Sequence, residues 1–424
     1  MSPHRITPSL PPVRVRIPGP AGTAGRRTGG PRRPGTALAA AWVLTRALML
    51  VLLAVDHLGD TGVAGEVDGL YRGWYEQWLA RGAFPADDVT WQYPPGAGLV
   101  LLSPGALPFL SYFHAFVALV LAADAVITVA LARAGRGAAA GSGGTGSAAG
   151  AWLWVAALPL LLNLPLARYD VLVTAVAVLA LLALRHRPLT GGALAGLGAM
   201  IKVWPVLTLL GTPRGRTTKE AWTAALAAAT GLLAVLVVLF DNTLGFLRQQ
   251  GARGVQIESL GGTVLQLARR AGWDGRVVYQ YGAMEFTGPY VSSVARLALA
   301  LTAAAFCWLL LWRVRARRWN AATPFDAAFA AVLLFTVVSR VISPQYLVWL
   351  IGLAAVCLTS RETVLRPAAL LMVPAAALSA LAYPLHYDDV IAATPLGCAL
   401  MVVRNALLLT AAVLACRRLW RATV

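Results

Sequence analysis

The chain has 424 residues, of which 58% are hydrophobic and 13% charged, and its mean hydropathy is +0.67. Soluble domains carry about a quarter charged residues, whereas apolar runs of membrane-spanning length recur here from residue 37 to residue 415. A net charge of +18 first suggests nucleic-acid binding, but the arginines lie at the ends of apolar runs, as in the cytoplasmic loops of membrane proteins. We therefore expect a polytopic membrane protein without a nucleic-acid partner.

The arginine distribution also predicts the domain organisation. Residues 1–36 hold seven arginines, many prolines and glycines and no acid, which predicts a disordered cytoplasmic segment. Residues 37–416 are expected to form one transmembrane domain with outer loops at 56–95 and 241–289, and residues 417–424 a short cytoplasmic tail. We count about a dozen membrane segments, several of them re-entrant or shorter than the ~20 residues that a span needs.

The first outer loop is unusually acidic, with seven of the 18 acidic residues between positions 56 and 88. Apolar side chains recur every four residues along it, and charged side chains do so on the opposite face (Leu70, Trp74 and Trp78; Asp68, Arg72 and Glu76). This pattern predicts a short helix lying at the membrane interface.

Asp68 on that helix is the first candidate for chemistry. A carboxylate beside the outer leaflet can act as a general base on a sugar or lipid hydroxyl. The alternative is an ion pair with Arg72 one turn further on. Asp87 and Asp88 are competing candidates in the same loop.

Two cations interrupt apolar sequence. Lys202 lies in the apolar run 199–204 before Pro205, and an ammonium at membrane depth usually faces a cavity or a partner, the alternative being that it snorkels to the interface. Arg340 precedes a polar turn between two apolar segments. Lys202 and Arg340 together could neutralise the charge of a phosphate leaving group. The alternative for Arg340 is a structural ion pair with an outer carboxylate such as Asp170.

Two further polar stretches fall on the same side of the membrane in this topology. Arg168 and Asp170 lie at a turn between two spans, where either a local salt bridge or a substrate contact fits. Gln256 and Glu258 lie in the loop that begins at Asp241, which would suit an acceptor lid or an ordinary loop helix. The sequence has no Walker loop, no Rossmann glycine fingerprint and no metal-ligand His/Cys spacing, so a cytoplasmic nucleotide-sugar donor is not supported.

The order of these motifs resembles that of glycosyltransferase family 87 over about residues 40–415. The resemblance rests on Asp68 with Tyr71, Tyr-Pro-Pro at 93–95, Arg-Tyr-Asp at 168–170, Gly-Leu-Gly at 196–198 before Lys202 and Pro205, Gln-Ile-Glu-Ser at 256–259 and Ser-Pro-Gln-Tyr at 343–346. The family includes actinobacterial polyprenol-phosphate-mannose-dependent α-1,2-mannosyltransferases. The resemblance implies an all-α polytopic GT-C fold and an inverting transfer of a hexose, mannose-like, or a pentose. The donor would be a polyprenyl-phosphate sugar and the acceptor a lipid or glycan, at the outer face of the plasma membrane.

The resemblance also implies roles for particular residues. Asp68 would be the base, and Lys202 and Arg340 would lie at the donor phosphate, although the family more often has Lys where this chain has Arg340. The other implied substrate-binding residues are Tyr93, Arg168, Asp170, Gln256, Glu258 and Gln345. No resident cofactor is implied, since the lipid-linked sugar is a substrate, and the scheme leaves a divalent metal open.

Two other functions remain as alternatives. A lipid or sugar transporter or flippase would also have broken helices and intramembrane charge, but it predicts internal repeats and polar groups on both sides of a midplane site. We find no convincing repeat, and the polar landmarks fall on one side. A non-catalytic scaffold of envelope synthesis predicts that Asp68, Lys202 and Arg340 are all replaceable.

Overall fold

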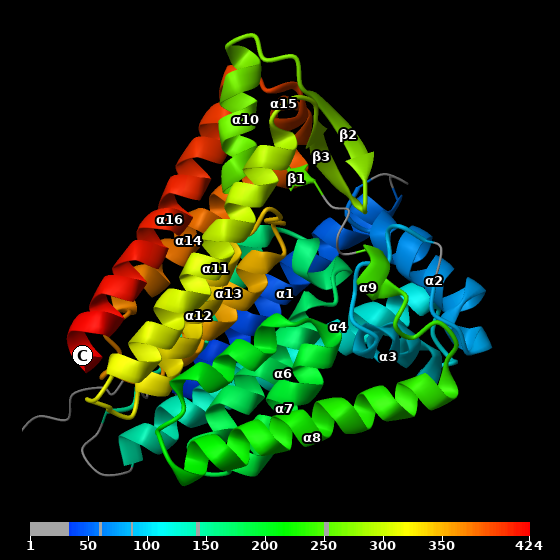
Figure 1. The fold of residues 1–424 in the computed structure, drawn as a ribbon. Helices are drawn as coiled ribbons and strands as arrows, with labels where there is room; N and C mark the ends of the chain where they lie inside the picture. The colour runs from blue at the N-terminus through cyan, green and yellow to red at the C-terminus, as the bar shows by residue number, and fades with distance from the viewer. Residues whose placement is uncertain (1–33, 59–61, 86–87, 141–144, 250–253) are drawn as a thin grey trace, which may run out of the picture.

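The computed structural model describes residues 34–58, 62–85, 88–140, 145–249 and 254–424. The predictions for residues 1–33 and for Asp87 lie outside these ranges. Six described helices are long and apolar enough to cross a membrane. They are α1 (Pro34–Leu58), α4 (Tyr112–Ala140), α8 (Arg216–Leu239), α11 (Val291–Arg315), α14 (Arg366–Ala380) together with the turn η7 (Leu381–Leu385) that continues it, and α16 (Pro395–Thr423) (Figure 1).

Six shorter apolar helices complete the bundle. They are α3 (Gly96–Leu102), α5 (Ala149–Ala157), α6 (Asp170–Ala183), α7 (Pro188–Ile201), α12 (Thr323–Val338) and α13 (Tyr346–Cys357). Six long and six short segments together match the predicted dozen. The nearly all-helical, polytopic prediction is therefore confirmed.

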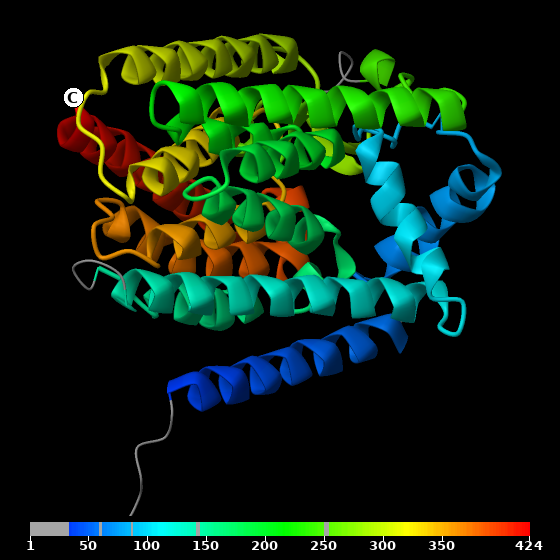
Figure 2. The same ribbon diagram turned by 90° about the horizontal axis from the view of Figure 1, so that it is seen from below.

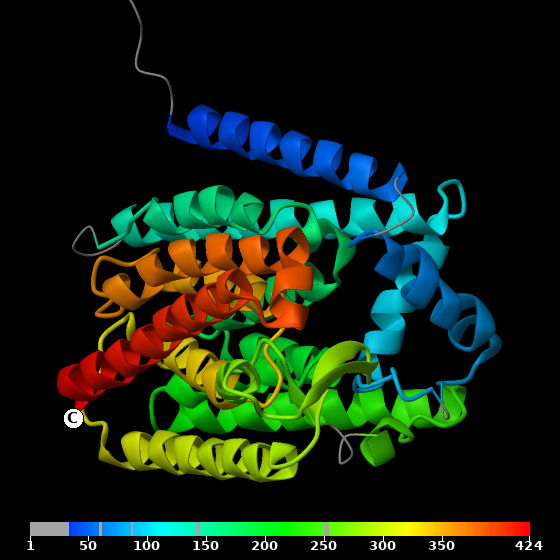
Figure 3. The same cartoon turned by 90° about the horizontal axis from the view of Figure 1, so that it is seen from above.

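Burial separates the helices inside the bundle from those on its outside. A helix that is apolar all round can lie in a protein interior or span a membrane, and every residue of α13 from Leu347 to Cys357 is buried. By contrast, only 11–17% of the apolar windows of α1, α8 and α11 is buried within the protein. These three helices lie on the outside of the bundle, with α1 beside α4 on one face and with α8 and the yellow α11 on the opposite face (Figures 2 and 3).

Helix α8 is attached to α7 through small residues four apart on both helices. A Cβ on Gly192 would lie 2.1 Å from the carbonyl oxygen of Ala221, and one on Gly196 would lie 2.2 Å from that of Ala225. Small residues at this spacing let helix backbones approach closely in a membrane, where the hydrophobic effect does not drive helix association.

Helix α1 is held by a buried polar cluster. The guanidinium of Arg46 binds both carboxylate oxygens of Asp124 on α4, with distances of 2.8 Å from Nε and 2.7 Å from Nη2. The indole nitrogens of Trp42 and Trp154 donate to the same carboxylate, and Arg46 also donates to the carbonyl of Val155. Because each charge is paired and hydrogen-bonded, the ion pair can remain buried among the helices.

The first loop contains the predicted helix, which begins as a π-helical turn. This turn, η1 (Glu66–Tyr71), continues into α2 (Arg72–Gln77) and the short 3₁₀ turn η2 (Leu79–Arg81). Trp74 is buried against Trp91, with ring centroids 5.0 Å apart, and its indole donates to Asp88 at 2.7 Å. Thr90 also donates to Asp88 through its backbone and its hydroxyl. Trp74 therefore packs inside the protein, and Asp88 organises the loop.

The second loop contains a three-stranded antiparallel sheet, which the sequence analysis did not predict. Strands β1 (Val255–Gln256), β2 (Arg276–Gln280) and β3 (Ala283–Thr287) pair in the order β1-β3-β2. Tyr281 and Gly282 connect β2 to β3 with φ angles of 53° and 75°. Positive φ at both central residues is typical of a tight hairpin turn, but Asn-Gly is its usual sequence signal and Tyr-Gly is not.

The two loops meet at one end of the bundle. The backbone of residues 82–84 pairs with that of Asp241 through two hydrogen bonds of 2.9 Å, and Gln256 donates to the carbonyl of Arg340 at 3.0 Å. The start of α1 and the C-terminus lie at the other end (Figures 2 and 3).

Candidate active site

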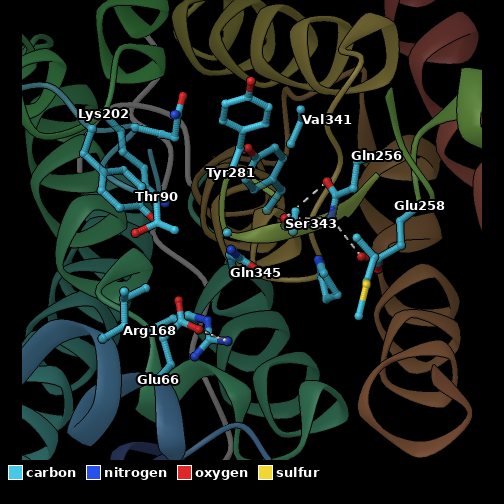
Figure 4. A pocket seen from close by; sticks show the side chains of 18 of the residues that line it. Glu66, Thr90, Arg168, Lys202, Gln256, Glu258, Tyr281, Val341, Ser343 and Gln345 are labelled. Carbon is cyan, nitrogen blue, oxygen red and sulfur yellow. Dashed lines mark hydrogen bonds and ion pairs between the residues drawn. The ribbon is translucent and has the colours of Figure 1, made fainter. Parts of the chain in front are cut away.

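A cavity of about 530 Å³ opens where the two loops meet (Figure 4). The first loop, the turn at Lys202, the hairpin tip, residues 341–349 and residues 383–387 all contribute to its wall. Ten of the 28 lining residues are aromatic: Tyr93, Trp204, Phe246, Tyr279, Tyr281, Phe335, Tyr346, Trp349, Tyr383 and Tyr387. Apolar ring faces combined with a few charged groups suit a ligand that has both apolar faces and polar substituents.

Arg168 lies on one side of the cavity, at the turn before α6. Its Nη1 donates to the backbone carbonyls of Val63 and Ala167 at 3.2 and 2.9 Å, which fixes the guanidinium. Its Nη2 lies 3.3 Å from a carboxylate oxygen of Glu66. Both side chains line the cavity (Figure 4). Arg168 and Asp170 are therefore not a local salt bridge, because each pairs with another residue.

Lys202 is enclosed more tightly. It follows α7, where Pro205 prevents continuation of the helix, and its ammonium lies 2.6 Å from Asp170. The indole of Trp349 donates to the same oxygen at 2.6 Å. Four aromatic rings, including Tyr169 at 4.5 Å and Trp349 at 5.0 Å, surround the ammonium. The cavity interpretation of Lys202 agrees with this geometry, since Lys202 lines the cavity and has Asp170 as its partner.

Glu258 lies on the opposite side of the cavity (Figure 4). It accepts a hydrogen bond from Gln256 Nε2 at 3.0 Å and lies 3.5 Å from Arg404 of α16, which is fully buried. Gln256 also reaches Ser343 at 3.3 Å. Burial raises the pKa of the Glu258 carboxyl from its ordinary value to about 7, although Arg404 and Gln256 act in the other direction.

The structure thus gathers most of the sequence-predicted residues around one cavity. Those in its lining are Tyr93, Arg168, Lys202, Gln256, Glu258 and Gln345. Asp170 lies behind Lys202 as its counter-ion. Asp68 and Arg340 are not among the described residues that line the cavity; Asp68 is partly exposed on η1, and Arg340 contributes its carbonyl to Gln256.

Glu66, Arg404 and the hairpin tyrosines were missed by the sequence analysis. Glu66 belongs to the same acidic loop as Asp68 and lies only two residues before it. Arg404 is a cation within the apolar run of α16, so the argument applied to Lys202 would have identified it. No comparable pattern in the sequence indicates that the hairpin tyrosines, Tyr279 and Tyr281, line the cavity.

Several buried polar atoms near Lys202 have no hydrogen-bond partner within the described structure. They are Arg168 Nε, the Tyr169 hydroxyl, Asp170 Oδ2 and Trp204 Nε1. Buried polar groups are nearly always paired, so this concentration points to a polar ligand at this side of the cavity. No group of three or more His, Cys, Asp or Glu residues among the described residues is placed to hold a metal ion.

The fold and cavity define a polytopic membrane protein with a polar, aromatic-lined site at one end of its helical bundle. A sequence model of glycosyltransferase family 87 matches residues 91–344, which is more than half of the chain. The chain therefore belongs to glycosyltransferase family 87 and is a membrane glycosyltransferase with a GT-C-type fold. No match was found among curated proteins or among solved structures.

Proposed function

We propose that this enzyme transfers a hexose, mannose-like, or a pentose from a polyprenyl-phosphate sugar to a lipid or glycan acceptor, with inversion. The observation that supports this most is the cavity itself, in which Arg168 and Lys202 lie on one side and Glu258 and Gln256 on the other. A phosphate suits the side with the cations. An acceptor hydroxyl suits the side with the carboxylate and the amide.

The reaction is an in-line displacement. The acceptor oxygen forms a bond to the anomeric carbon as its proton passes to a carboxylate, and the bond from that carbon to the phosphate oxygen breaks. Polyprenyl phosphate leaves with the bonding electron pair, so its new negative charge needs a nearby cation more than a proton. Arg168, with donors in a planar fork, suits that task.

The proposed site faces the outer side of the plasma membrane, with both termini cytoplasmic. Arginine-rich segments gather at the opposite end of the bundle from the cavity: Arg214 donates to the carbonyl of Arg313, and the backbone of Arg317 and Arg318 donates to the carbonyl of Thr423. The positive-inside rule supports this orientation.

The base is proposed to come from η1. Asp68 is the candidate that the sequence predicts, and Glu66 is the candidate that the cavity supports, because it lines the wall beside Arg168. A positioned general base typically contributes about 10²–10⁴-fold. We expect replacement of the true base by its amide to lower the transfer rate by about that factor.

The test is transfer of labelled sugar by purified protein in liposomes. Wild type, Glu66→Gln and Asp68→Asn receive a labelled polyprenyl-phosphate sugar and a lipid extract as acceptor, and a nucleotide sugar is offered in parallel. The matched control is Glu76→Gln in the same loop, whose side chain is 53% exposed and pairs with Arg72. The proposal predicts a covalent product from the lipid-linked donor alone and loss in one of the two η1 variants. Movement of the labelled lipid across the bilayer without product would favour a flippase instead.

A further inference from the structure

The two cations of the cavity already have carboxylate partners, so a phosphate that binds there must compete with one of them. The two ion pairs differ in geometry and in exposure. Lys202 and Asp170 lie 2.6 Å apart, and the Asp170 side chain is 1% exposed. Arg168 and Glu66 lie 3.3 Å apart, and the Glu66 side chain is 27% exposed.

The surroundings of the two carboxylates also make Asp170 harder to displace than Glu66. Asp170 accepts from both Lys202 and Trp349 at 2.6 Å, so its departure would leave two buried donors unpaired. That loss is costly in a protein interior. Among the residues that the structure describes, Glu66 has one long ion-pair contact, to Arg168, and its side chain is already partly exposed to solvent. The Arg168 pair is therefore the one that opens at lower cost.

The guanidinium of Arg168 is also ready for a second anion. Its Nη1 is anchored to two backbone carbonyls, so the group stays in place when Glu66 leaves. The opposite edge presents Nε and Nη2, two parallel donors that can bind phosphate oxygens in a bidentate manner. On that edge, Nε has no hydrogen-bond partner within the described structure, and Nη2 has the 3.3 Å contact to Glu66.

We infer that Glu66 is an exchangeable counter-ion, and that a phosphate monoester or diester displaces it from Arg168 when it binds. The inference rests on the proposed function for its ligand class. Before the phosphate binds, Glu66 neutralises Arg168. Once the phosphate is bound it does so instead, and the Glu66 carboxylate is released from the guanidinium onto the cavity wall.

The test measures binding of farnesyl phosphate and of inorganic phosphate to the full-length protein in detergent, without any acceptor. Removing the competing charge in Glu66→Gln should tighten farnesyl phosphate binding about fivefold, as expected from loss of a partly exposed ion pair worth about 1 kcal/mol. Glu76→Gln should bind as wild type does. Arg168→Lys, which keeps the charge but loses the planar fork, should bind at least about tenfold more weakly.

The outcomes separate this inference from the proposed function. Unchanged or weaker binding by Glu66→Gln, with wild type still binding, overturns the inference alone. Failure of every variant to bind either compound, with unchanged melting temperatures, overturns both the inference and the donor class. If Glu66→Gln also binds inorganic phosphate about fivefold more tightly, the phosphate group alone displaces Glu66. If only the affinity for farnesyl phosphate increases, displacement of Glu66 also needs the lipid chain.

Discussion

Glu258 combines burial with a place in the cavity wall, and this makes its charge state depend on pH near neutrality. Its pKa is raised to about 7, chiefly by burial. The groups that face it are Arg404, Gln256 and, more distantly, the tyrosines at 383 and 387. An ionised carboxylate accepts a hydrogen bond from an acceptor hydroxyl more strongly than a protonated carboxyl does.

We therefore predict that the transfer rate of wild type rises as the pH increases from about 6 to about 8, with an inflection near 7. Glu258→Gln should lose that inflection. Because folding raises this pKa, protonated Glu258 stabilises the fold at low pH, and that contribution is lost as the pH rises through about 7. Since burial raises this pKa from 4.5 to about 7, the melting temperature should fall across that interval and level off above about pH 7. An identical pH–rate profile in Glu258→Gln would show that another group titrates.

At the residue scale, the sequence is most informative where the charge of a side chain conflicts with its apolar surroundings. Lys202 was identifiable because an ammonium in an apolar run must have a partner. The sequence could not decide which of the neighbouring acids in the first loop lines the cavity, because that depends on backbone geometry. The helical wheel placed Asp68 on one stripe with Arg72 and Glu76 by assuming 3.6 residues per turn, but η1 is a π-helical turn. A π turn rotates each side chain differently, and Glu66 rather than Asp68 meets Arg168.

At the scale of elements, the contact between α7 and α8 depends on two glycines and two alanines. A β-branched side chain at Gly196 would overlap the backbone of Ala225. We predict that Gly196→Val forces the helices apart and lowers the stability of the protein by about 1–3 kcal/mol or more. The matched control is Gly231→Ala on α8 itself, where a Cβ meets no atom within 4 Å; this change should be neutral or stabilising by up to about 1 kcal/mol. Thermal unfolding in detergent measures both, and equal melting temperatures for the two variants would contradict the close-packing account.

The sequence predicted helices better than it predicted the second loop. Apolar runs specify membrane helices because backbone groups in lipid must be satisfied within the segment. The sheet has short strands, the turn between β2 and β3 is the atypical Tyr-Gly, and β1 lies well before its partner β3 in the chain, so local patterns carry little information about it. The hairpin nevertheless places Tyr281 in the cavity wall.

At the scale of the whole molecule, the helices divide into an outer set and an inner set. Helices α1, α8 and α11 face outward with little of their surface buried, whereas α6, α12 and α13 form the interior. The cavity lies at the end where the loops join, which is opposite to the start of α1 and to the C-terminus (Figures 2 and 3). The sequence predicted this grouping of polar turns at one end from charge alone, since arginine-rich ends alternate with polar turns along the chain. The sequence could not predict that these turns line one cavity, because that depends on how helices far apart in the chain pack together.

The central claim is that this cavity holds the phosphate and the anomeric carbon of a lipid-linked sugar. The most direct measurement is a cryo-EM structure of the full-length protein with a polyprenyl-phosphate sugar bound. We predict density for the phosphate with its oxygens about 2.7–2.9 Å from the Nε and Nη2 atoms of Arg168. Glu66 should be displaced from Arg168, and the sugar should lie among the aromatic rings of the cavity. Phosphate density outside the cavity, with the contact between Arg168 and Glu66 intact, would contradict the account.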